Sequence, residues 1–129
     1  MTEGTPKQYA GVWFDNHHAT IVTHDTAAKG LEFFIKEKLE ADVYQGEKGE
    51  HTKNNADRSN SLKYFKSMSR LLVHFDEIYI FGPGKAQEEL VNFLVDDSHF
   101  KSKKISIDSA KQMSDKQLIA KVREFFSAN

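Results

Sequence analysis

The chain contains no cysteine among its 129 residues, which excludes disulfide bonds and thiolate chemistry and fits a reducing compartment. It also lacks long hydrophobic runs: no stretch approaches the roughly 20 apolar residues of a membrane-spanning helix, and Met1–Lys7 has no apolar segment of a signal peptide. Eighteen basic and nineteen acidic residues give a formal net charge of -1, so no overall field attracts nucleic acid or membrane. We therefore expect a soluble, cytoplasmic protein with no membrane partner, in which any attraction to nucleic acid is local.

Aromatic residues, in contrast, are plentiful: ten Phe, four Tyr and one Trp are enough to build the core of one domain. No internal repeat or linker divides the chain. We predict a disordered N-terminal tail over residues 1–7 and a single domain over residues 8–127.

The first third of the chain has the pattern of an antiparallel meander. An apolar run from Tyr9 to Asp15 ends at the turn-favouring residues Asn16-His17-His18, and a β-branched run over Ala19–Thr23 follows, which predicts a β-hairpin. Apolar residues then alternate with polar ones from Leu31 to Leu39, as in a half-exposed strand. An exposed edge strand of such a meander is a surface through which a homo-oligomer could form.

The remainder alternates helices with strands. Helical spacing relates Leu62, Phe65, Ser69 and Leu72, and Asp57 or Ser59 is available as the N-cap. The apolar run Ile78–Phe81 suits a strand covered on both faces, as in a parallel sheet, and Pro83 then stands where a helix would begin.

The next helix should bury one stripe and expose the other. The buried stripe comprises Ala86, Leu90, Phe93 and Leu94, and the exposed one comprises Gln87, Glu88, Glu89 and Asn92. A short strand over Lys103–Asp108 follows, with Ile105 and Ile107 facing inward, and a capping box at Ser114 opens a last helix. The predicted fold is α/β: a single mixed five-stranded sheet with three helices, in the order βββαβαβα, whose last two strands run parallel to the first.

A long polar segment from Asp42 to Asn60 has neither helical nor strand periodicity. From Lys48 to Arg70, six basic residues stand against two acidic ones, a local net charge of +4 that could meet RNA phosphates. Amide, imidazole and aromatic side chains in the same region could bond or stack with exposed bases. The candidate RNA-binding residues are Lys48, His51, Lys53, Asn54, Asn55, Arg58 and Lys63. The alternative is a solvated loop followed by a helix with a charged outer face.

The turn Gly82-Pro83-Gly84-Lys85 precedes a helix, and backbone N–H groups at a helix N-terminus favour phosphate or carboxylate. Gly82, Gly84 and Lys85 are therefore candidate anion-binding residues for a small phosphorylated ligand. The alternative is a tight strand-to-helix connection. The turn is not a Walker loop, because the required spacing is missing and Pro83 removes one donor.

Three local patterns together resemble a known family. They are Trp13-Phe14-Asp15 followed by Ala19-Thr20-Ile21, the polar loop that leads into a helix, and Ile80-Phe81-Gly82-Pro83-Gly84. In this order they resemble the middle domain of archaeal and eukaryotic class-1 peptide-chain release factors and of Pelota-type ribosome-rescue factors, including bacterial relatives. The resemblance covers Tyr9 to Phe126.

The resemblance implies a ribonuclease H-like fold and a non-catalytic, RNA-binding role in translation, with the ribosome or tRNA as partner and no cofactor. Release factors carry Gly-Gly-Gln in the loop that here runs from Gly49 to Arg58, and this sequence has no Gly-Gly-Gln. Peptidyl-tRNA hydrolysis is therefore not carried over.

A ribonuclease H-like sheet also suggests a metal-dependent phosphodiesterase as an alternative, with Asp15 and Asp108 as catalytic ligands. Asp76 and Glu77 precede their strand, so they should lie at the opposite edge of the sheet. Adjacent His17 and His18 would point to opposite faces of a strand. We therefore expect no metal site.

Overall fold

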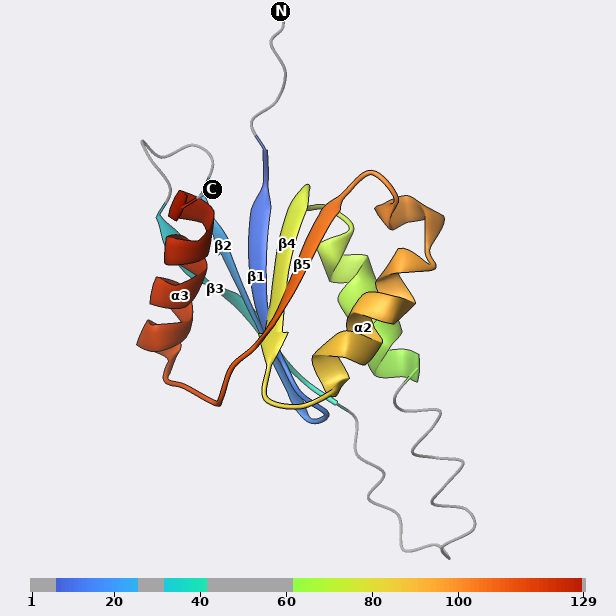
Figure 1. The fold of residues 1–129 in the computed structure, drawn as a ribbon, viewed down its shortest axis with the longest axis horizontal. Coiled ribbons are helices and arrows are strands. Elements are labelled where there is room, and N and C mark those ends of the chain that lie inside the picture. Colours follow the sequence, from blue (N-terminus) through green and yellow to red (C-terminus); the bar gives the residue numbers. More distant parts are fainter. Residues whose placement is uncertain (1–6, 26–31, 42–61, 129) are drawn as a thin grey trace, which may run out of the picture.

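The computed structural model describes residues 7–25, 32–41 and 62–128 of the chain. Its centre is one five-stranded sheet in the order β3-β2-β1-β4-β5 (Figure 1). The strands are β1 (Tyr9–Phe14), β2 (His18–His24), β3 (Phe33–Glu40), β4 (Glu77–Gly82) and β5 (Lys104–Ser109). Strands β1, β2 and β3 pair antiparallel, whereas β4 is parallel to β1 and β5 is parallel to β4. The predicted mixed sheet, with an antiparallel meander as one wing, is confirmed.

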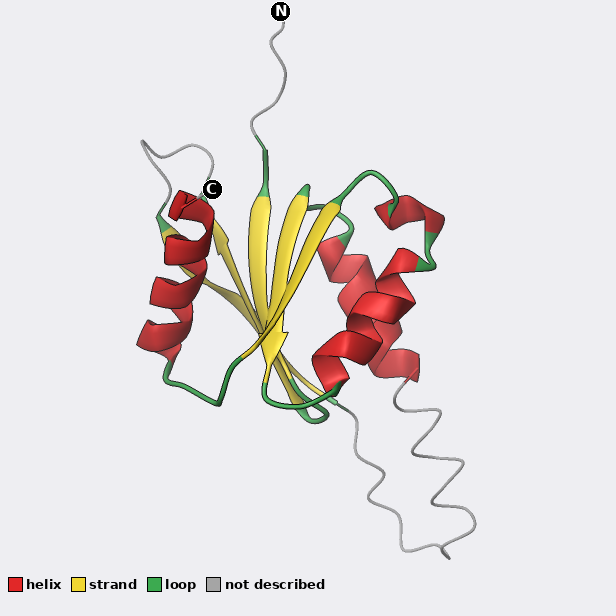
Figure 2. Cartoon of the chain, in the orientation of Figure 1, coloured by secondary structure: helices red, strands yellow, loops and turns green. Residues whose placement is uncertain are grey.

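Helices cover both faces of the sheet, giving three layers (Figure 2). A helix over residues 62–72 and α2 (Ala86–Val95) lie on one face, and α3 (Asp115–Ala128) lies on the other. A 3₁₀ turn, η1 (Ser98–Phe100), precedes β5. The predicted order βββαβαβα is confirmed, and no helix among the described residues is long and apolar enough to cross a membrane.

Each face of the sheet has its own hydrophobic core. The core under the 62–72 helix and α2 is the larger and includes Phe14, Tyr64, Met68, Leu72, Ile78, Ile80, Leu90 and Leu94. The core under α3 includes Trp13, Val22, Phe33, Tyr79, Phe81, Leu118, Val122 and Phe126. The adjacent residues of β4 thus contribute to opposite cores, which explains why its sequence is apolar throughout.

Strand β3 does not keep one face, as simple alternation would require. Phe33 and Ile35 pack with the α3 core, whereas Leu39 packs with the opposite core. The reason is a β-bulge: the pairing with β2 shifts between Ile21 and Val22, which exchanges the faces of the residues beyond it.

Three expectations around α2 were wrong. Gln87 is only 1% exposed, although it was expected to face water. Pro83 does not begin the helix, which starts at Ala86 after a three-residue turn. Ile107 is 46% exposed because it lies on β5, an edge strand with no strand on its outer side among the described residues.

Candidate functional site

The hairpin between β1 and β2 meets the start of the 62–72 helix at one end of the strands, where β1 ends. One carboxylate oxygen of Asp15 accepts hydrogen bonds from the amides of His17 at 2.8 Å and His18 at 2.7 Å. The Asp15 carbonyl oxygen accepts a hydrogen bond from the Tyr64 hydroxyl at 3.1 Å. The amide of Ala41 donates to the His17 carbonyl oxygen at 2.8 Å. These bonds tie the described chain on both sides of the 42–61 segment to the same hairpin.

Aromatic stacking holds the 62–72 helix at this end of the strands. The Tyr64 ring stacks on Phe14, with centroids 4.8 Å apart, and Phe65 lies between Phe14 and Phe93. Burial, and secondarily the charge of Asp15, raises the pKa of Tyr64 above its usual range, so this hydroxyl remains a hydrogen-bond donor. The first turn of the helix is thus packed against β1 and hydrogen-bonded to the β1–β2 hairpin.

The outer face of this helix is basic. Lys63, Lys66 and Arg70 are exposed and stand at positions i, i+3 and i+7, which places them on one side of the helix. We call these three residues the basic helix face. Residues 62–72 contain no Asp or Glu, and the basic helix face makes no ion pair with another described residue.

The charge of the neighbouring α2 has the opposite sign. Exposed Glu88 and Glu89 occupy its first turn, and Asp96 follows its last residue. The two helices that share one face of the sheet therefore divide it into a basic and an acidic part, a separation that the overall net charge of -1 conceals.

Of the predicted RNA-binding residues, only Lys63 belongs to the described part of the chain, where it is exposed. Six others lie outside the described residues: Lys48, His51, Lys53, Asn54, Asn55 and Arg58. Sequence reasoning had counted Lys66 and Arg70 in the local charge but had not placed them in the site. Their spacing from Lys63 is the signal that would have done so.

The two glycines of the candidate anion site differ in role. A Cβ on buried Gly82 would lie 2.1 Å from the Phe14 carbonyl oxygen, whereas a Cβ on Gly84 would meet nothing within 4 Å. Lys85, the N-cap residue of α2, makes no side-chain cap hydrogen bond, which leaves the first amides of the helix uncapped by it. Glu88 and Glu89 already complement the helix dipole there and would repel an anion.

Gln87 completes the connection between β4 and α2 from the inside. Its Nε2 donates to the Gly82 carbonyl oxygen at 2.9 Å and to the Asp108 carbonyl oxygen at 3.4 Å, while Oε1 is buried without a hydrogen-bond partner. Sequence reasoning missed this residue because it is polar. Its position three residues before Leu90 and seven before Leu94 would have assigned it to the buried stripe.

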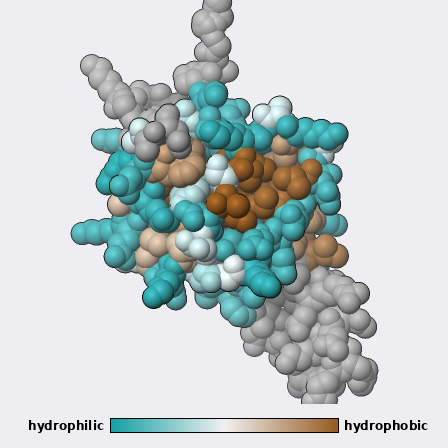
Figure 3. Space-filling model, in the orientation of Figure 1, coloured by the Kyte–Doolittle hydropathy of each residue, from teal (hydrophilic) through white to brown (hydrophobic). Residues whose placement is uncertain are grey.

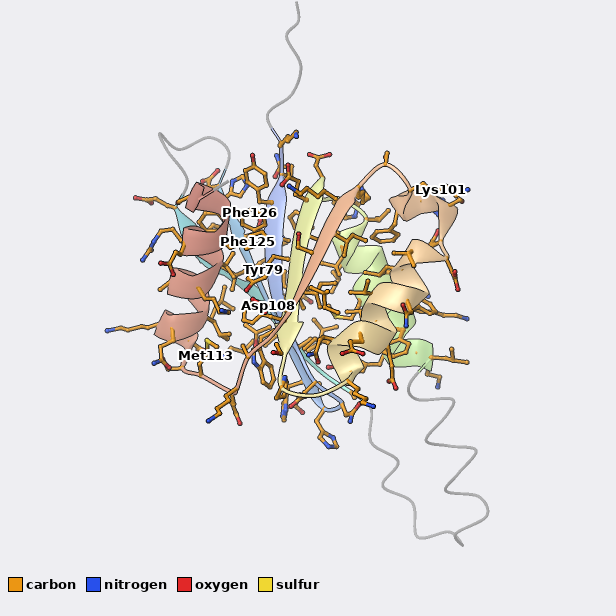
Figure 4. All side chains as sticks on the ribbon, viewed as in Figure 1. Tyr79, Lys101, Asp108, Met113, Phe125 and Phe126 are labelled. Carbon is orange, nitrogen blue, oxygen red and sulfur yellow. The ribbon has the colours of Figure 1, made fainter. Side chains whose placement is uncertain are left out.

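The two candidate catalytic carboxylates are engaged in separate local structures. Asp108 lies on β5, where it accepts hydrogen bonds from the Tyr79 hydroxyl at 2.9 Å and from the Ser109 amide at 2.8 Å (Figure 4). The Ser109 amide, and then the Tyr79 hydroxyl, lowers the pKa of Asp108. Asp15 belongs to the β1–β2 hairpin, and in the sheet β4 lies between β1 and β5, the strand that carries Asp108.

At the other end of the strands, where β1 and β4 begin, the Asp76 carboxylate accepts a hydrogen bond from the Gln8 amide at 2.8 Å. Glu77 forms an ion pair with Lys7 at 3.2 Å. Among the described residues, no three His, Cys, Asp or Glu side chains come together as metal ligands. The phosphodiesterase hypothesis therefore gains no geometric support.

Comparison with known proteins gives matches only among solved structures, since no family model and no curated protein matches the sequence. The archaeal translation termination factor aRF1 superposes with a TM-score of 0.53 at 17% identity, covering 91% of this chain and 34% of that one. Dom34 of S. cerevisiae, a translation termination-like factor, superposes with a TM-score of 0.54 at 16% identity, covering 93% of this chain and 33% of Dom34. Pelota of Archaeoglobus fulgidus superposes with a TM-score of 0.51 at 13% identity, covering 96% of this chain and 34% of Pelota.

The fold is that of a release-factor-like domain. The resemblance predicted from the sequence is thereby confirmed at the level of fold. The chain spans about one third of the length of each of these proteins, so what the whole proteins do is not transferred with the fold.

Proposed function

We propose that this release-factor-like domain is a translation-associated module that binds ribosomal or transfer RNA without hydrolysing peptidyl-tRNA. The fold resemblance to a translation termination factor, and to a translation termination-like factor involved in RNA quality control pathways, supports the translation setting. The absence of Gly-Gly-Gln from the sequence supports a non-hydrolytic role. The observation that carries the RNA contact is the basic helix face.

Geometry and charge suit the basic helix face to a phosphate backbone. Lys63 and Arg70 are seven residues apart, which is about 10 Å along a helix. That length matches about three phosphates at the roughly 3.4 Å axial spacing of one duplex strand. Since no described carboxylate pairs with these cations, their charge is available to an anionic partner.

The test neutralises the basic helix face by Lys63→Gln, Lys66→Gln and Arg70→Gln. A matched control, Lys111→Gln with Lys116→Gln and Arg123→Gln, removes the same charge from exposed positions before and along α3. Fluorescence anisotropy with a labelled RNA hairpin and a labelled single strand measures Kd between about 50 and 200 mM salt. Sedimentation through sucrose then measures binding to purified ribosomes at low and high salt.

The first variant should bind RNA about tenfold or more weakly at low salt. Its plot of log K against log salt should lose about 2 to 3 units of slope, since each lost phosphate contact removes about 0.7 to 0.9. The control variant should bind like the parent. Equal losses in both variants, or an unchanged salt slope in the first, would contradict the assignment to this face. RNA binding without ribosome sedimentation would contradict the translation setting alone.

A further inference from the structure

One edge of the sheet, the outer side of β5, has no strand beside it within the described structure. The amide of Lys104 donates to the Asp76 carbonyl oxygen at 3.1 Å, and the amide of Ala110 donates to the Gly82 carbonyl oxygen at 2.7 Å. Along a strand, alternate residues direct both backbone groups to the same side. Even-numbered residues therefore bond to β4, and Ile105 and Ile107 direct their N–H and C=O groups outward. The amide of Ser109, the next residue of this set, already donates to the Asp108 carboxylate at 2.8 Å.

The side chains of β5 alternate between the two faces of the sheet. Ile105 and Ile107 stand beside Ile78 and Ile80 on the α2 face, whereas Ser106 and Asp108 stand beside Tyr79 and Phe81 on the α3 face. By the same alternation, exposed Lys104 shares the face of Asp108. β5 therefore presents isoleucine side chains on the α2 face and polar or charged side chains on the α3 face.

The α2 face of the edge is mostly apolar, although the exposed Glu88 of α2 lines the same hollow as Ile107. Ile107 is 46% exposed and Val95, on α2, is 53% exposed, while Ile105 and Val91 are partly buried beside them. Figure 3 shows this hydrophobic surface as a continuous patch over β5 and α2. Exposed apolar side chains beside unpaired backbone groups are the features of a strand that pairs with another chain.

We propose that β5 pairs antiparallel with β5 of a second copy of this chain about a two-fold axis at Ser106, which joins the two five-stranded sheets into one. In this register Ile105 lies opposite Ile107 of the second copy, and the two residues exchange both backbone hydrogen bonds. Lys104 lies opposite Asp108 of the second copy, in a pair that has no backbone hydrogen bonds and therefore brings the side chains closest.

Backbone parity and charge select this register. Outward-facing residues must lie opposite one another, so a two-fold axis can pass through Ile105, Ser106 or Ile107 but not between residues. An axis at Ile105 would oppose Lys104 to Ser106, and an axis at Ile107 would oppose Asp108 to Ser106. With the axis at Ser106, Lys104 of each copy lies opposite Asp108 of the other, so opposite charges meet at both ends of the interface. This complementarity favours a second copy of this chain as the occupant.

The neighbouring groups suit the paired arrangement. The Tyr79 hydroxyl and the Ser109 amide hold the Asp108 carboxylate, while Lys104 has no ion-pair partner among the described residues. Since α2 contacts both β4 and β5, it lies above the space between them. The two copies of α2 would then stand about two strand spacings apart, about 10 Å, which is a normal helix packing distance. Val91 and Val95 would fill that contact.

The opposite edge of the sheet, β3, is the one that the sequence suggested for self-association. It carries Lys36, Glu37, Lys38 and Glu40 within five residues. Charged residues of this density discourage strand pairing at an edge. Strand β5 has two charged residues, and these complement each other across the proposed axis.

A charge-exchange experiment tests the register. Sedimentation equilibrium and light scattering measure the association of the parent, Lys104→Glu and Asp108→Lys, each alone and then mixed in equal amounts. The parent should dimerise with increasing concentration. Each variant alone opposes like charges at both ends of the interface and should dimerise about tenfold or more weakly.

The mixture of the two variants restores opposite charges at both ends of the interface. The glutamate introduced in one variant meets the lysine introduced in the other. At the far end, the unchanged Asp108 of the first variant meets the unchanged Lys104 of the second. A one-to-one heterodimer should therefore form where neither variant dimerises well alone.

Lys116→Glu, an equal charge change at an exposed position on α3, is the control and should dimerise like the parent. Thermal melting establishes that each variant is folded. If Asp108→Lys unfolds because it loses the Tyr79 hydroxyl, Ile107→Lys replaces it and should abolish the dimer. A parent that stays monomeric to about 1 mM, a dimer insensitive to Lys104→Glu, or a mixture that forms no heterodimer despite folded partners would overturn the proposal.

Discussion

The side-chain amide of Gln87 bonds the carbonyl oxygen of Gly82 at 2.9 Å, across the turn that joins β4 to α2. The same side chain reaches the carbonyl oxygen of Asp108 at 3.4 Å, so it links the ends of two parallel strands to the first turn of the helix. On the other side, Gly82 lies against the Phe14 carbonyl oxygen of β1. The connection is therefore enclosed by β1, β5 and α2 at once.

We expect Gly82→Ala to destabilise the domain by about 2 to 3 kcal/mol, because the added methyl group must displace backbone of β1 rather than a flexible side chain. The Cβ would lie 2.1 Å from the Phe14 carbonyl oxygen and 2.9 Å from Gln87 Oε1. Urea unfolding measures the change. Gly84→Ala, where a Cβ meets nothing within 4 Å, is the matched control and should change stability little. Similar losses in both variants would show that backbone conformation, not close approach, decides.

We expect Asp15 to act as a turn residue rather than as a metal ligand. Its carboxylate accepts two backbone hydrogen bonds, from His17 at 2.8 Å and His18 at 2.7 Å. Asp15→Ala should therefore cost about 1 to 2 kcal/mol, whereas Asp15→Asn, which keeps an acceptor, should cost less. Chemical unfolding with and without Mg²⁺ measures both effects. Stabilisation of the parent by Mg²⁺ that disappears in Asp15→Asn would revive the phosphodiesterase hypothesis.

We expect stability to fall in mild acid because of His24. This side chain is 5% exposed, its Nε2 accepts the Tyr9 amide at 3.0 Å, and burial lowers its pKa from the ordinary 6.5 while Asp25 opposes the shift. Below about pH 6.5 the unfolded chain takes up a proton that the folded chain does not, so this contribution to stability is lost as pH falls through the folded pKa.

The measurement is urea unfolding between about pH 5 and 8, in which one proton corresponds to a slope of about 1.4 kcal/mol per pH unit. His24→Gln keeps an acceptor for the Tyr9 amide but cannot titrate, and should flatten the profile. His17→Gln changes an exposed histidine and should leave the profile as in the parent. A His24→Gln profile as steep as that of the parent would assign the acid sensitivity to other groups.

At alkaline pH, two buried tyrosines should control stability. Burial raises the pKa of both Tyr64 and Tyr79 above the ordinary 10.0, assisted by the charge of Asp15 and by the hydrogen bond to Asp108 respectively. The unfolded chain therefore loses these protons first, and the free energy of unfolding falls as pH rises above about 10. Tyr64→Phe and Tyr79→Phe should each cost about 1 kcal/mol at neutral pH and reduce the alkaline slope by about one proton. Unfolding followed from about pH 8 to 11 checks this, and an unchanged slope in both variants would contradict it.

Local patterns were sufficient for the elements and their order, because each strand and helix carries its own periodicity. The apolar run Ile78–Phe81 predicted a strand covered on both faces, and β4 supplies Ile78 and Ile80 to one core and Tyr79 and Phe81 to the other. The right-handed crossover rule then predicted that β4 and β5 are parallel to β1, as observed.

Patterns that depend on neighbours from elsewhere in the chain were not predictable in the same way. The bulge between β2 and β3 requires both strands to be paired, so the change of face between Ile35 and Leu39 is invisible in β3 alone. Ile107 has the alternation of a core residue, and it is exposed because β5 lies at the edge of the sheet. Gln87 has the spacing of the buried stripe but a polar side chain, and the carbonyl groups of Gly82 and Asp108 explain how that side chain is accommodated in the interior.

By itself, then, the sequence determined the α/β class, the number and order of the described strands and helices, and the resemblance to a release-factor-like domain, since these follow from periodicity and local motifs. The tertiary structure decided that a basic and an acidic helix share one face of the sheet, which strand is left as an apolar edge, and which carboxylates remain apart. Those properties are relations between residues distant in the chain. Packing alone creates them, because a side chain acquires its burial, its hydrogen-bond partners and its local charge only from the elements that fold against it.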